Sequence, residues 1–113
     1  MTFDDGLVVI YDVANKTEPG AIPQKVLKES KRFFYSIETA GIKRIYEAVR
    51  ANQQIDLLIA VYRDEQLSTN QIAETENGDQ FIIRTIQHMN DENNIKITKL
   101  GLERQGEKYE IIR

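Results

Sequence analysis

Apolar positions in this chain recur mainly at the spacing of β-strands. The run "LVVIYDV", from Leu7 to Val13, is rich in β-branched and aromatic residues and follows a glycine, which predicts a first strand. Pro19, Gly20 and Pro23 then interrupt the pattern, because a Pro-Gly pair favours a turn and each proline removes a backbone donor. Residues Ala14 to Gln24 are therefore expected to form a long exposed loop.

A second strand and one helix are predicted next. "KRFFYSIE", from Lys31 to Glu38, carries aromatic residues on both faces and is typical of a strand, which could begin a few residues earlier. After it the period changes to that of a helix, with Thr39 as a candidate N-cap and Asn52 as a stop. At about twelve residues such a helix is marginal alone, so its apolar stripe should anchor it to the sheet. The stripe consists of Ile42, Ile45, Tyr46 and Val49.

The second half of the chain reads as further strands. "QIDLLIAVYR" is apolar on both faces and predicts a central strand covered on two sides. Asn77 and Gly78 separate two strand-like segments, the pair that a type I′ hairpin turn favours. "IKITKLGLE" is another strand whose apolar phase slips, which suggests a bulge near Thr98 and Lys99. "KYEII" extends it or forms a short terminal strand.

These elements predict a mainly β protein, a small antiparallel β-barrel of about six or seven strands with one short helix inserted after the second strand. Consecutive strands joined by tight turns pair antiparallel, and a small sheet hides its edges by closing on itself. The length of 113 residues fits one domain spanning residues 1–113.

Charge and composition narrow the function. The formal charge of -3 has the wrong sign for a protein whose main task is to grip phosphate backbones. The chain contains no cysteine, which excludes disulfides, thiolate metal sites and a cysteine nucleophile. Its first residues do not resemble a signal peptide, and no apolar run is long enough to cross a bilayer, so a soluble protein made in the cytoplasm is expected.

Candidate catalytic groups are sparse. His88 is the only histidine and precedes Asp91 and Glu92, but this spacing matches no known metal framework, and a solvated turn is the favoured interpretation. Asp56 and Glu74 could be drawn as an acid–base pair, as could many other pairs among 18 carboxylates. We therefore expect no enzyme activity, no metal and no cofactor.

An aromatic and basic cluster offers an alternative. Stacking platforms on barrels bind single-stranded nucleic acid through interleaved aromatic and basic residues. Because the net charge is acidic, we favour a strand buried against the helix and keep nucleic-acid binding as the alternative function. The cluster consists of Lys31, Arg32, Phe33, Phe34 and Tyr35.

From about Phe34 to Ile111 the chain resembles the head-to-tail connector proteins of tailed bacteriophages or prophages, specifically the head-closure or stopper class. The resemblance rests on the aromatic strand, the "YEA" helix, the extended "IDLLIAVYR" strand, the "NGDQF" hairpin and the final "ITKLGLER" strand. These motifs are structural and short, and none is catalytic. The segment "ANKTEPGAIPQ" is longer and carries more proline than the opening hairpin usual in the family.

The resemblance implies a structural virion assembly protein. Such a protein forms a ring below the portal and adaptor proteins after DNA packaging, closes the DNA channel and joins the tail, while DNA passes nearby without specific binding. It is made in the host bacterial cytoplasm and resides at the head–tail interface of the virion. We expect the isolated chain to be a monomer that self-associates only at the portal vertex.

The resemblance also implies that the segment between the second strand and the central strand approaches the channel. The predicted helix would anchor this insertion, and the residues after it would face the channel axis or a neighbouring subunit. The loops Ala14 to Gln24 and Asp64 to Asn70 are expected to be mobile until neighbours order them. The candidate channel or interface residues are Arg50, Ala51, Asn52, Gln53 and Gln54.

Overall fold

The computed structural model describes residues 3–16, 20, 24–38, 55–106 and 109–112. Seven strands occupy these residues, and the part of the chain so described contains no helix. The strands are β1 (Gly6–Lys16), β2 (Gln24–Ile37), β3 (Leu57–Tyr62), β4 (Ile72–Thr75), β5 (Gln80–Asn90), β6 (Lys96–Arg104) and β7 (Glu110–Ile112).

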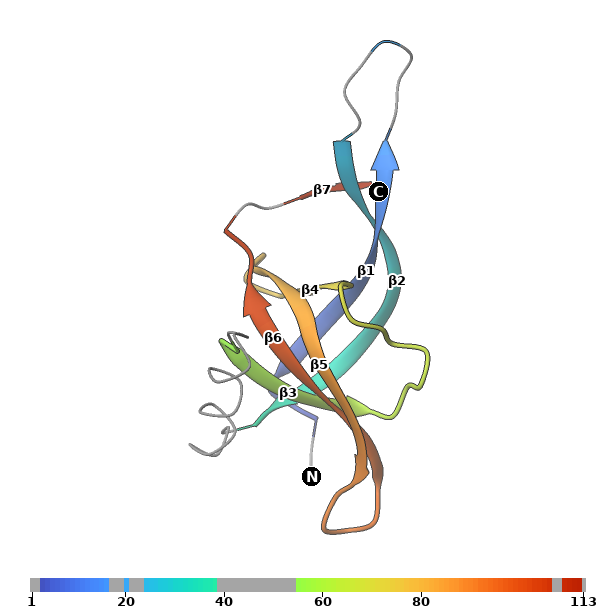
Figure 1. Cartoon of the computed structure of the whole chain (residues 1–113). Helices are drawn as coiled ribbons and strands as arrows, with labels where there is room; N and C mark the ends of the chain where they lie inside the picture. The colour runs from blue at the N-terminus through green and yellow to red at the C-terminus, as the bar shows by residue number, and fades with distance from the viewer. Residues whose placement is uncertain (1–2, 17–19, 21–23, 39–54, 107–108, 113) are drawn as a thin grey trace.

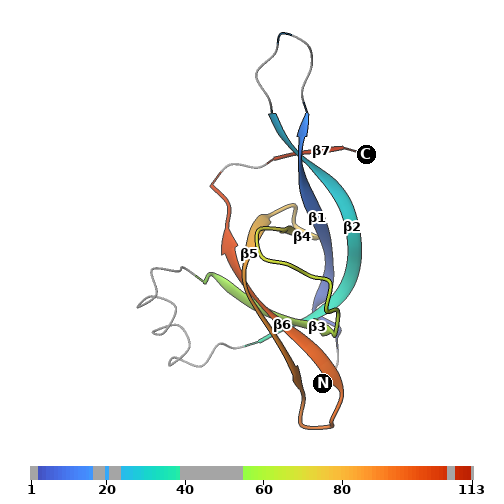
Figure 2. The same cartoon turned by 45° about the vertical axis from the view of Figure 1, so that its right-hand side comes forward.

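Six of the strands close into an antiparallel ring. The order is β1-β4-β5-β6-β3-β2, and a further pairing of β1 with β2 joins the two ends (Figures 1 and 2). The seventh strand, β7, lies outside the ring and pairs in parallel with β2. The predicted mainly β, antiparallel fold is confirmed at this level.

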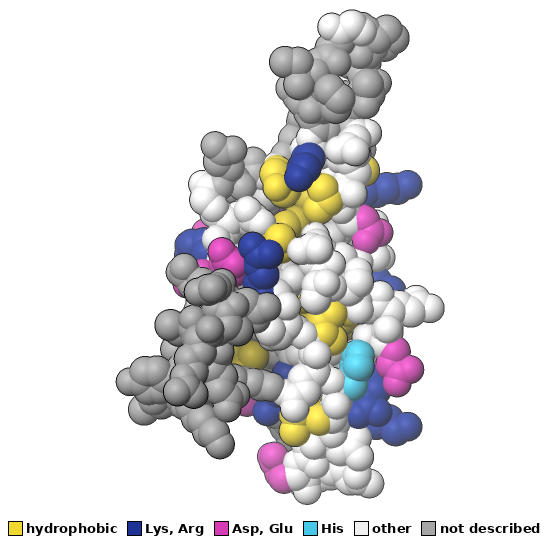
Figure 3. Space-filling model, in the orientation of Figure 1, with side chains coloured by type: hydrophobic (Ala, Val, Ile, Leu, Met, Phe, Trp, Pro, Cys, Tyr) yellow, Lys and Arg dark blue, Asp and Glu magenta, His cyan; other side chains and the backbone are white. Residues whose placement is uncertain are grey.

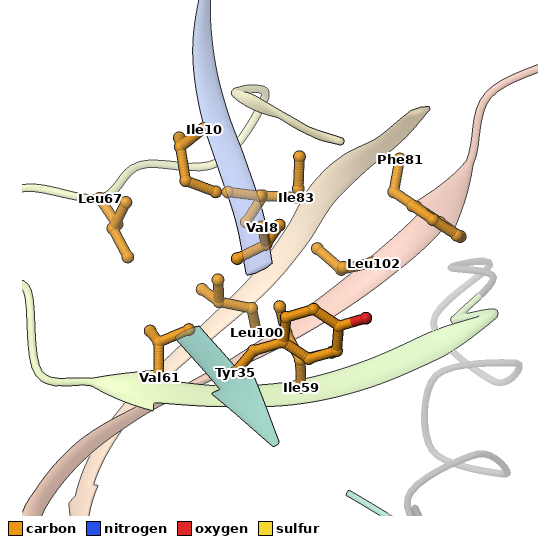
Figure 4. Packing of buried hydrophobic residues seen from close by; sticks show 11 residues of the cluster. Val8, Ile10, Tyr35, Ile59, Val61, Leu67, Phe81, Ile83, Leu100 and Leu102 are labelled. Atoms are coloured by element: carbon orange, nitrogen blue, oxygen red, sulfur yellow. The ribbon is translucent and has the colours of Figure 1, made fainter. Parts of the chain in front are cut away.

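The main apolar core fills the ring. Alternate residues of β1, β3 and β6 point inward, and Phe33 and Tyr35 of β2 join them because β-strand side chains alternate between faces. Figure 4 shows the buried side chains of this core, Tyr35 among them, pointing toward one another between the strands. The buried members are Val8, Ile10, Tyr35, Ile59, Val61, Leu67, Ala73, Phe81, Ile83, Leu100 and Leu102.

The central-strand prediction is confirmed for β3. This strand lies between β2 and β6, and Leu58 and Ala60 on its second face are 6% and 0% exposed. Its pairing with β6 runs without interruption from Leu57 to Tyr62. Within the described residues, its pairing with β2 comprises Ser36 with Ala60 and Ile37 with Ile59, and Glu38 N donates to Leu58 O at 2.8 Å beyond them. The ring is therefore held at this seam by few backbone contacts.

The segment between β3 and β4 fills the space beside that seam. Leu67, only 6% exposed, inserts into the core, and the backbone N–H of Asn70 donates to Ile83 O at 3.0 Å. The Asp64 N–H donates to Thr98 Oγ1 at 3.2 Å. Contacts within the chain hold this segment, so the prediction that only neighbouring subunits order Asp64 to Asn70 is wrong.

A two-stranded arm formed by β1 and β2 projects from the ring (Figure 1). Strand β4 pairs with β1 only from Val8 to Tyr11, yet β1 continues beside β2 as far as the pair Lys16 and Gln24. The molecule consequently measures 54 × 30 × 25 Å. The predicted loop from Ala14 to Gln24 is thus too long, because both of its ends belong to this ladder, and the second strand begins at Gln24 rather than near Lys31.

The hairpin at Asn77 and Gly78 is confirmed, but its turn is not type I′. Only Gly78 has a positive φ, 82°, and its N–H donates to Thr75 O at 2.9 Å. Thr75 N then donates to Asp79 O at 3.2 Å, the pattern of a type I turn followed by a glycine bulge. The next hairpin repeats this pattern, with Asn94 at φ 63° and Asn94 N donating to Asp91 O at 3.0 Å.

The predicted bulge at Thr98 and Lys99 is wrong. The register of β6 against β3 is continuous there, and the irregularity lies on the neighbouring strand β5, where Arg84 is the extra residue between Ile83 and Thr85. A second bulge lies on β2, where Ser30 is extra because Ile10 pairs with Lys31 and Tyr11 with Glu29. The terminal strand predicted from "KYEII" is present as β7.

The predicted helix and the segment after it lie outside the described residues. The same is true of the centre of the first loop. Within the described ranges, no helix is long and apolar enough to cross a membrane. The predictions that lie outside the described residues concern Ile42, Ile45, Tyr46, Val49, Arg50, Ala51, Asn52, Gln53 and Gln54.

Candidate functional site

A second apolar cluster lies on the outside of the ring. Tyr11, Leu27 and Ile72 are 4%, 0% and 0% exposed and pack together although their strands turn these side chains away from the main core. Partly buried residues pack against them. These are Val9, Ile82, Tyr109 and Ile111.

The bulge at Ser30 creates this cluster. In the lower part of β2, Phe33 pairs with Val8 and points inward. Side chains alternate along a strand, so Leu27 would share that face if the ladder were regular. The extra residue reverses the alternation, and Leu27 pairs with Val13 on the outer face instead.

An open groove of ≈ 780 Å³ runs along this outer face. Apolar side chains form part of its lining, and charged side chains from β2 and β4 flank them. In Figure 3, apolar and basic side chains likewise adjoin at the surface in the upper part of the view. The lining residues are Val9, Tyr11, Lys28, Glu29, Arg32, Glu74 and Ile111.

Hydrogen bonds fix the charged groups of the groove. Arg32 donates from Nη2 and Nε to Glu29 Oε1 at 2.7 and 3.0 Å, and the hydrogen bond and charge of Glu29 raise the pKa of Arg32. The hydroxyl of Tyr11 donates to Glu74 Oε1 at 3.2 Å. The groove thus presents an apolar floor with fixed charges beside it, an arrangement suited to holding a segment of protein.

The C-terminal segment covers one side of the groove, and Gln80 holds it there. Gln80 is 4% exposed, and its side-chain Nε2 donates to Tyr109 O at 3.0 Å while Tyr109 N donates to Gln80 Oε1 at 2.8 Å. The backbone O of Gln80 accepts from Gln105 N at 2.9 Å. The buried side-chain amide of Gln80 therefore pairs with the backbone of Tyr109 as a neighbouring strand would, and so holds the segment that leads into β7.

The predicted aromatic and basic platform is divided between two faces of β2. Phe33 and Tyr35 point into the ring, whereas Phe34 is 65% exposed on the outside. The Tyr35 hydroxyl donates to Glu76 Oε1 at 3.3 Å, and burial, followed by the charge of Glu76, raises the pKa of Tyr35. The three rings do not share a surface, because adjacent residues of a strand alternate between faces.

The two basic residues of the same cluster each contact a carboxylate. Lys31 donates to Asp64 and, at 3.2 Å, to Gln66 Oε1. Arg32, on the opposite face, contacts Glu29 as described above. Tyr35 is buried and Phe33 is partly buried in the ring core, and the predicted packing of this strand against the helix lies outside the described residues.

The residues around His88 serve the β5–β6 hairpin. His88 is exposed, and its Nδ1 lies 2.9 Å from Thr98 Oγ1. Asp91 Oδ1 accepts from Ile95 N at 2.8 Å and Asn93 N at 2.9 Å, and the bond from Ile95 is the main cause that lowers the pKa of Asp91. No group of three or more histidine and acidic residues able to hold a metal exists among the residues described.

Asp56 and Glu74 engage different strands. Asp56 Oδ2 accepts from Arg104 N at 2.7 Å at the end of β6, whereas Glu74 accepts from Tyr11 on β1. Each carboxylate therefore serves as a hydrogen-bond acceptor at a different place in the sheet.

The fold is similar to that of a solved bacterial protein structure. The solution structure of protein SF1141 from Shigella flexneri 2a matches with a TM-score of 0.64 and 10% sequence identity, over 91% of this chain and 94% of that chain. At this identity the likeness concerns the fold alone. No family model matches the sequence, and no curated protein matches it significantly.

Proposed function

We propose that the chain is a structural component of the head-to-tail connector of a tailed bacteriophage or prophage, of the head-closure or stopper class, and that its closed ring is a small barrel of that class. The observation that carries this proposal is the projecting β1–β2 arm, together with the groove on the outer face of the ring, which has an apolar floor and charged side chains beside it. Surfaces of this kind are suited to contacts with neighbouring subunits.

In this role several copies would form a ring below the portal and adaptor proteins, close the DNA channel and present a surface to the tail. The isolated chain would be a monomer, and the host bacterial cytoplasm would be the place of assembly. The net charge of -3 supports a role as the lining of a channel from which DNA must later be ejected. Each lysine or arginine added to such a lining would form a contact with a DNA phosphate that ejection has to break. Residues Arg50 to Gln54 are still predicted to face the channel or to contact a neighbouring subunit.

The direct test mixes the purified chain with portal–adaptor complexes and with tails of a candidate phage. We expect ring-shaped density below the adaptor by electron microscopy and a gain in DNA retention by filled heads. Bovine serum albumin at equal concentration serves as a control. Absence of both effects at saturating protein would contradict the proposal.

The alternative is a small β-barrel protein that binds nucleic acid. Phe34 is exposed on the same face of β2 as Arg32, and an exposed aromatic ring beside a cation suits base stacking. A salt-dependent mobility shift of a labelled single-stranded oligonucleotide, lost in Phe34→Ala, would support this alternative. No binding at low salt would remove it, because electrostatic attraction to phosphates is strongest there.

A further inference from the structure

The site on β2 that receives β7 accepts a short strand through backbone pairing and one apolar side chain. Val26, Leu27 and Lys28 pair in parallel with Glu110, Ile111 and Ile112. Ile111 packs against the outer cluster of Tyr11, Leu27 and Ile72. This edge of β2 therefore accommodates the sequence of β7, whether β7 comes from the same chain or from another copy.

Gln80 is contacted by residues at both ends of the connection from β6 to β7. Gln105 N bonds to the backbone O of Gln80, and Tyr109 bonds to the side chain of the same glutamine. Residues 105 and 109 therefore both contact Gln80. Fully extended, four residue steps would span about 14 Å, enough to carry the last strand away from its own β2.

The pairing of β7 within one chain is limited. It comprises three residue pairs, and β7 forms the end of the strand order, so its outer edge has no neighbour within the described ranges. Parallel pairing is slightly less stable per residue than antiparallel pairing. Releasing β7 consequently leaves the six-stranded ring intact.

We propose that β7 is exchanged between copies, so that β7 of one subunit pairs with β2 of the next. The contacts are the same within and between chains, so the isolated chain is a monomer at low concentration, and exchange requires either high concentration or neighbours that are held in place. A contact that joins two different surfaces head to tail can close into a ring. This inference rests on the proposed ring and names the surface through which copies of the chain associate.

Cross-linking between two single-cysteine variants tests the exchange. The natural chain has no cysteine, so Lys28→Cys and Ile112→Cys supply the only thiols. Positions 28 and 112 are register partners, and neighbouring strands lie within disulfide reach. The two variants are mixed at high concentration, warmed, cooled and mildly oxidised, and a 28–112 heterodimer is expected on a non-reducing gel.

The matched control is Lys25→Cys mixed with Ile112→Cys. Residue 25 is exposed on the same strand, but it pairs with Asn15 of β1 and has no β7 partner. The 28–112 heterodimer should exceed the 25–112 heterodimer several-fold. Equal yields of the two heterodimers would overturn the proposal.

A double variant carrying Lys28→Cys and Ile112→Cys tests the same point within one chain. Oxidation at low concentration should lock β7 onto its own β2, and circular dichroism would show that the fold is retained. The locked form should stay monomeric by sedimentation at high concentration, whereas its reduced form should associate. Equal association of both forms would count against exchange.

The outcomes separate this inference from the proposed function. A specific 28–112 link without binding to portal–adaptor complexes would leave the exchange standing and remove the connector role. Ring-shaped density on those complexes without the 28–112 link would support the connector role and remove the exchange of β7.

Discussion

Gly101 of β6 lies where a methyl group has no room. A Cβ at this position would lie 2.2 Å from Thr85 Oγ1 and 3.0 Å from Ile55 Cδ1. Thr85 is its register partner across the β5–β6 ladder, beside the bulge at Arg84. Close approach of the two strands there thus depends on the absence of a side chain.

We predict that Gly101→Ala lowers the free energy of unfolding by about 1–3 kcal/mol through overpacking. Thr85→Ala removes the nearest atom, so the double variant should recover much of that loss. Urea unfolding of both single variants and the double variant gives the coupling energy. Strictly additive losses would show that Thr85 is not the cause.

Asp64 is a residue whose charge state affects stability. Its carboxylate accepts from Lys31 and, at 2.8 Å, from Gln66 N, and the hydrogen bond from Lys31 is the main cause that lowers the pKa of Asp64. Because the pKa is lower in the folded state, this contribution is complete above the unfolded value of about 4 and is lost as the pH falls through the folded value.

We therefore predict that Asp64→Asn costs about 1 kcal/mol or less at pH 7 and unfolds with a weaker pH dependence below about pH 4. The control is Glu65→Gln, a neighbouring exposed carboxylate with the same change in charge. Urea midpoints measured from pH 7 to pH 2 decide the matter. Identical pH profiles for Asp64→Asn and the natural chain would contradict the assignment.

At the scale of elements, local patterns predicted the strands but not their ends or faces. The apolar run of β1, the two-sided β3 and the turn at Gly78 were visible because each is marked by neighbouring residues. The continuation of β1 and β2 into the arm was not, since Pro19, Gly20 and Pro23 make the whole stretch resemble a loop although Ala14 to Lys16 pair with β2.

The candidate site was beyond local prediction for a related reason. Its outer cluster depends on the extra residue Ser30, which has no signature in the apolar period, and on β7, which pairs with residues far away in sequence. The sequence indicates aromatic residues on both faces of this strand, but the alternative platform groups Phe33, Phe34 and Tyr35 on one surface, which the alternation of faces does not allow. Lys28, Arg32 and Glu74 of the groove lacked any motif that could single them out together.

The turn between β4 and β5 gives a prediction for an element. Gly78 adopts φ 82°, a conformation that costs most residues about 1–2 kcal/mol but is tolerated better by asparagine. Gly78→Ala should therefore destabilise the protein by about 1 kcal/mol, and Gly78→Asn by less. Thermal unfolding of the two variants provides the measurement, and a loss in Gly78→Asn as large as in Gly78→Ala would contradict it.

At the scale of the whole molecule, the ring is closed unevenly. Among the residues that the structure describes, β2 and β3 share two residue pairs and the bond from Glu38 N to Leu58 O, and Leu67 from the segment after β3 inserts into the core beside them. An apolar side chain in this position excludes water from the end of the core that backbone pairing protects least.

Leu67→Ala is expected to lower the free energy of unfolding by about 2–5 kcal/mol, as large-to-small changes at buried sites do. Leu67→Met, which keeps the volume, should cost less than about 1.5 kcal/mol. Chemical unfolding measures the stability, and amide exchange at Glu38, whose N–H donates to Leu58 O at 2.8 Å, reports opening of the seam. A loss of less than about 0.5 kcal/mol in Leu67→Ala would mean that this side chain is only a surface contact.

The length of β1 and β2 has a mechanical consequence. Both strands run from the outer end of the arm into the ring, so tension on the arm passes along them to the ladders with β4 and β3. Tension along a strand makes it slide past its neighbour, and the hydrogen bonds perpendicular to the strands resist this sliding collectively. The β2–β3 ladder, which has two described pairs, is shorter than the β1–β4 ladder and would yield first. Pulling experiments anchored at residues 16 and 104 would locate the first rupture at that ladder.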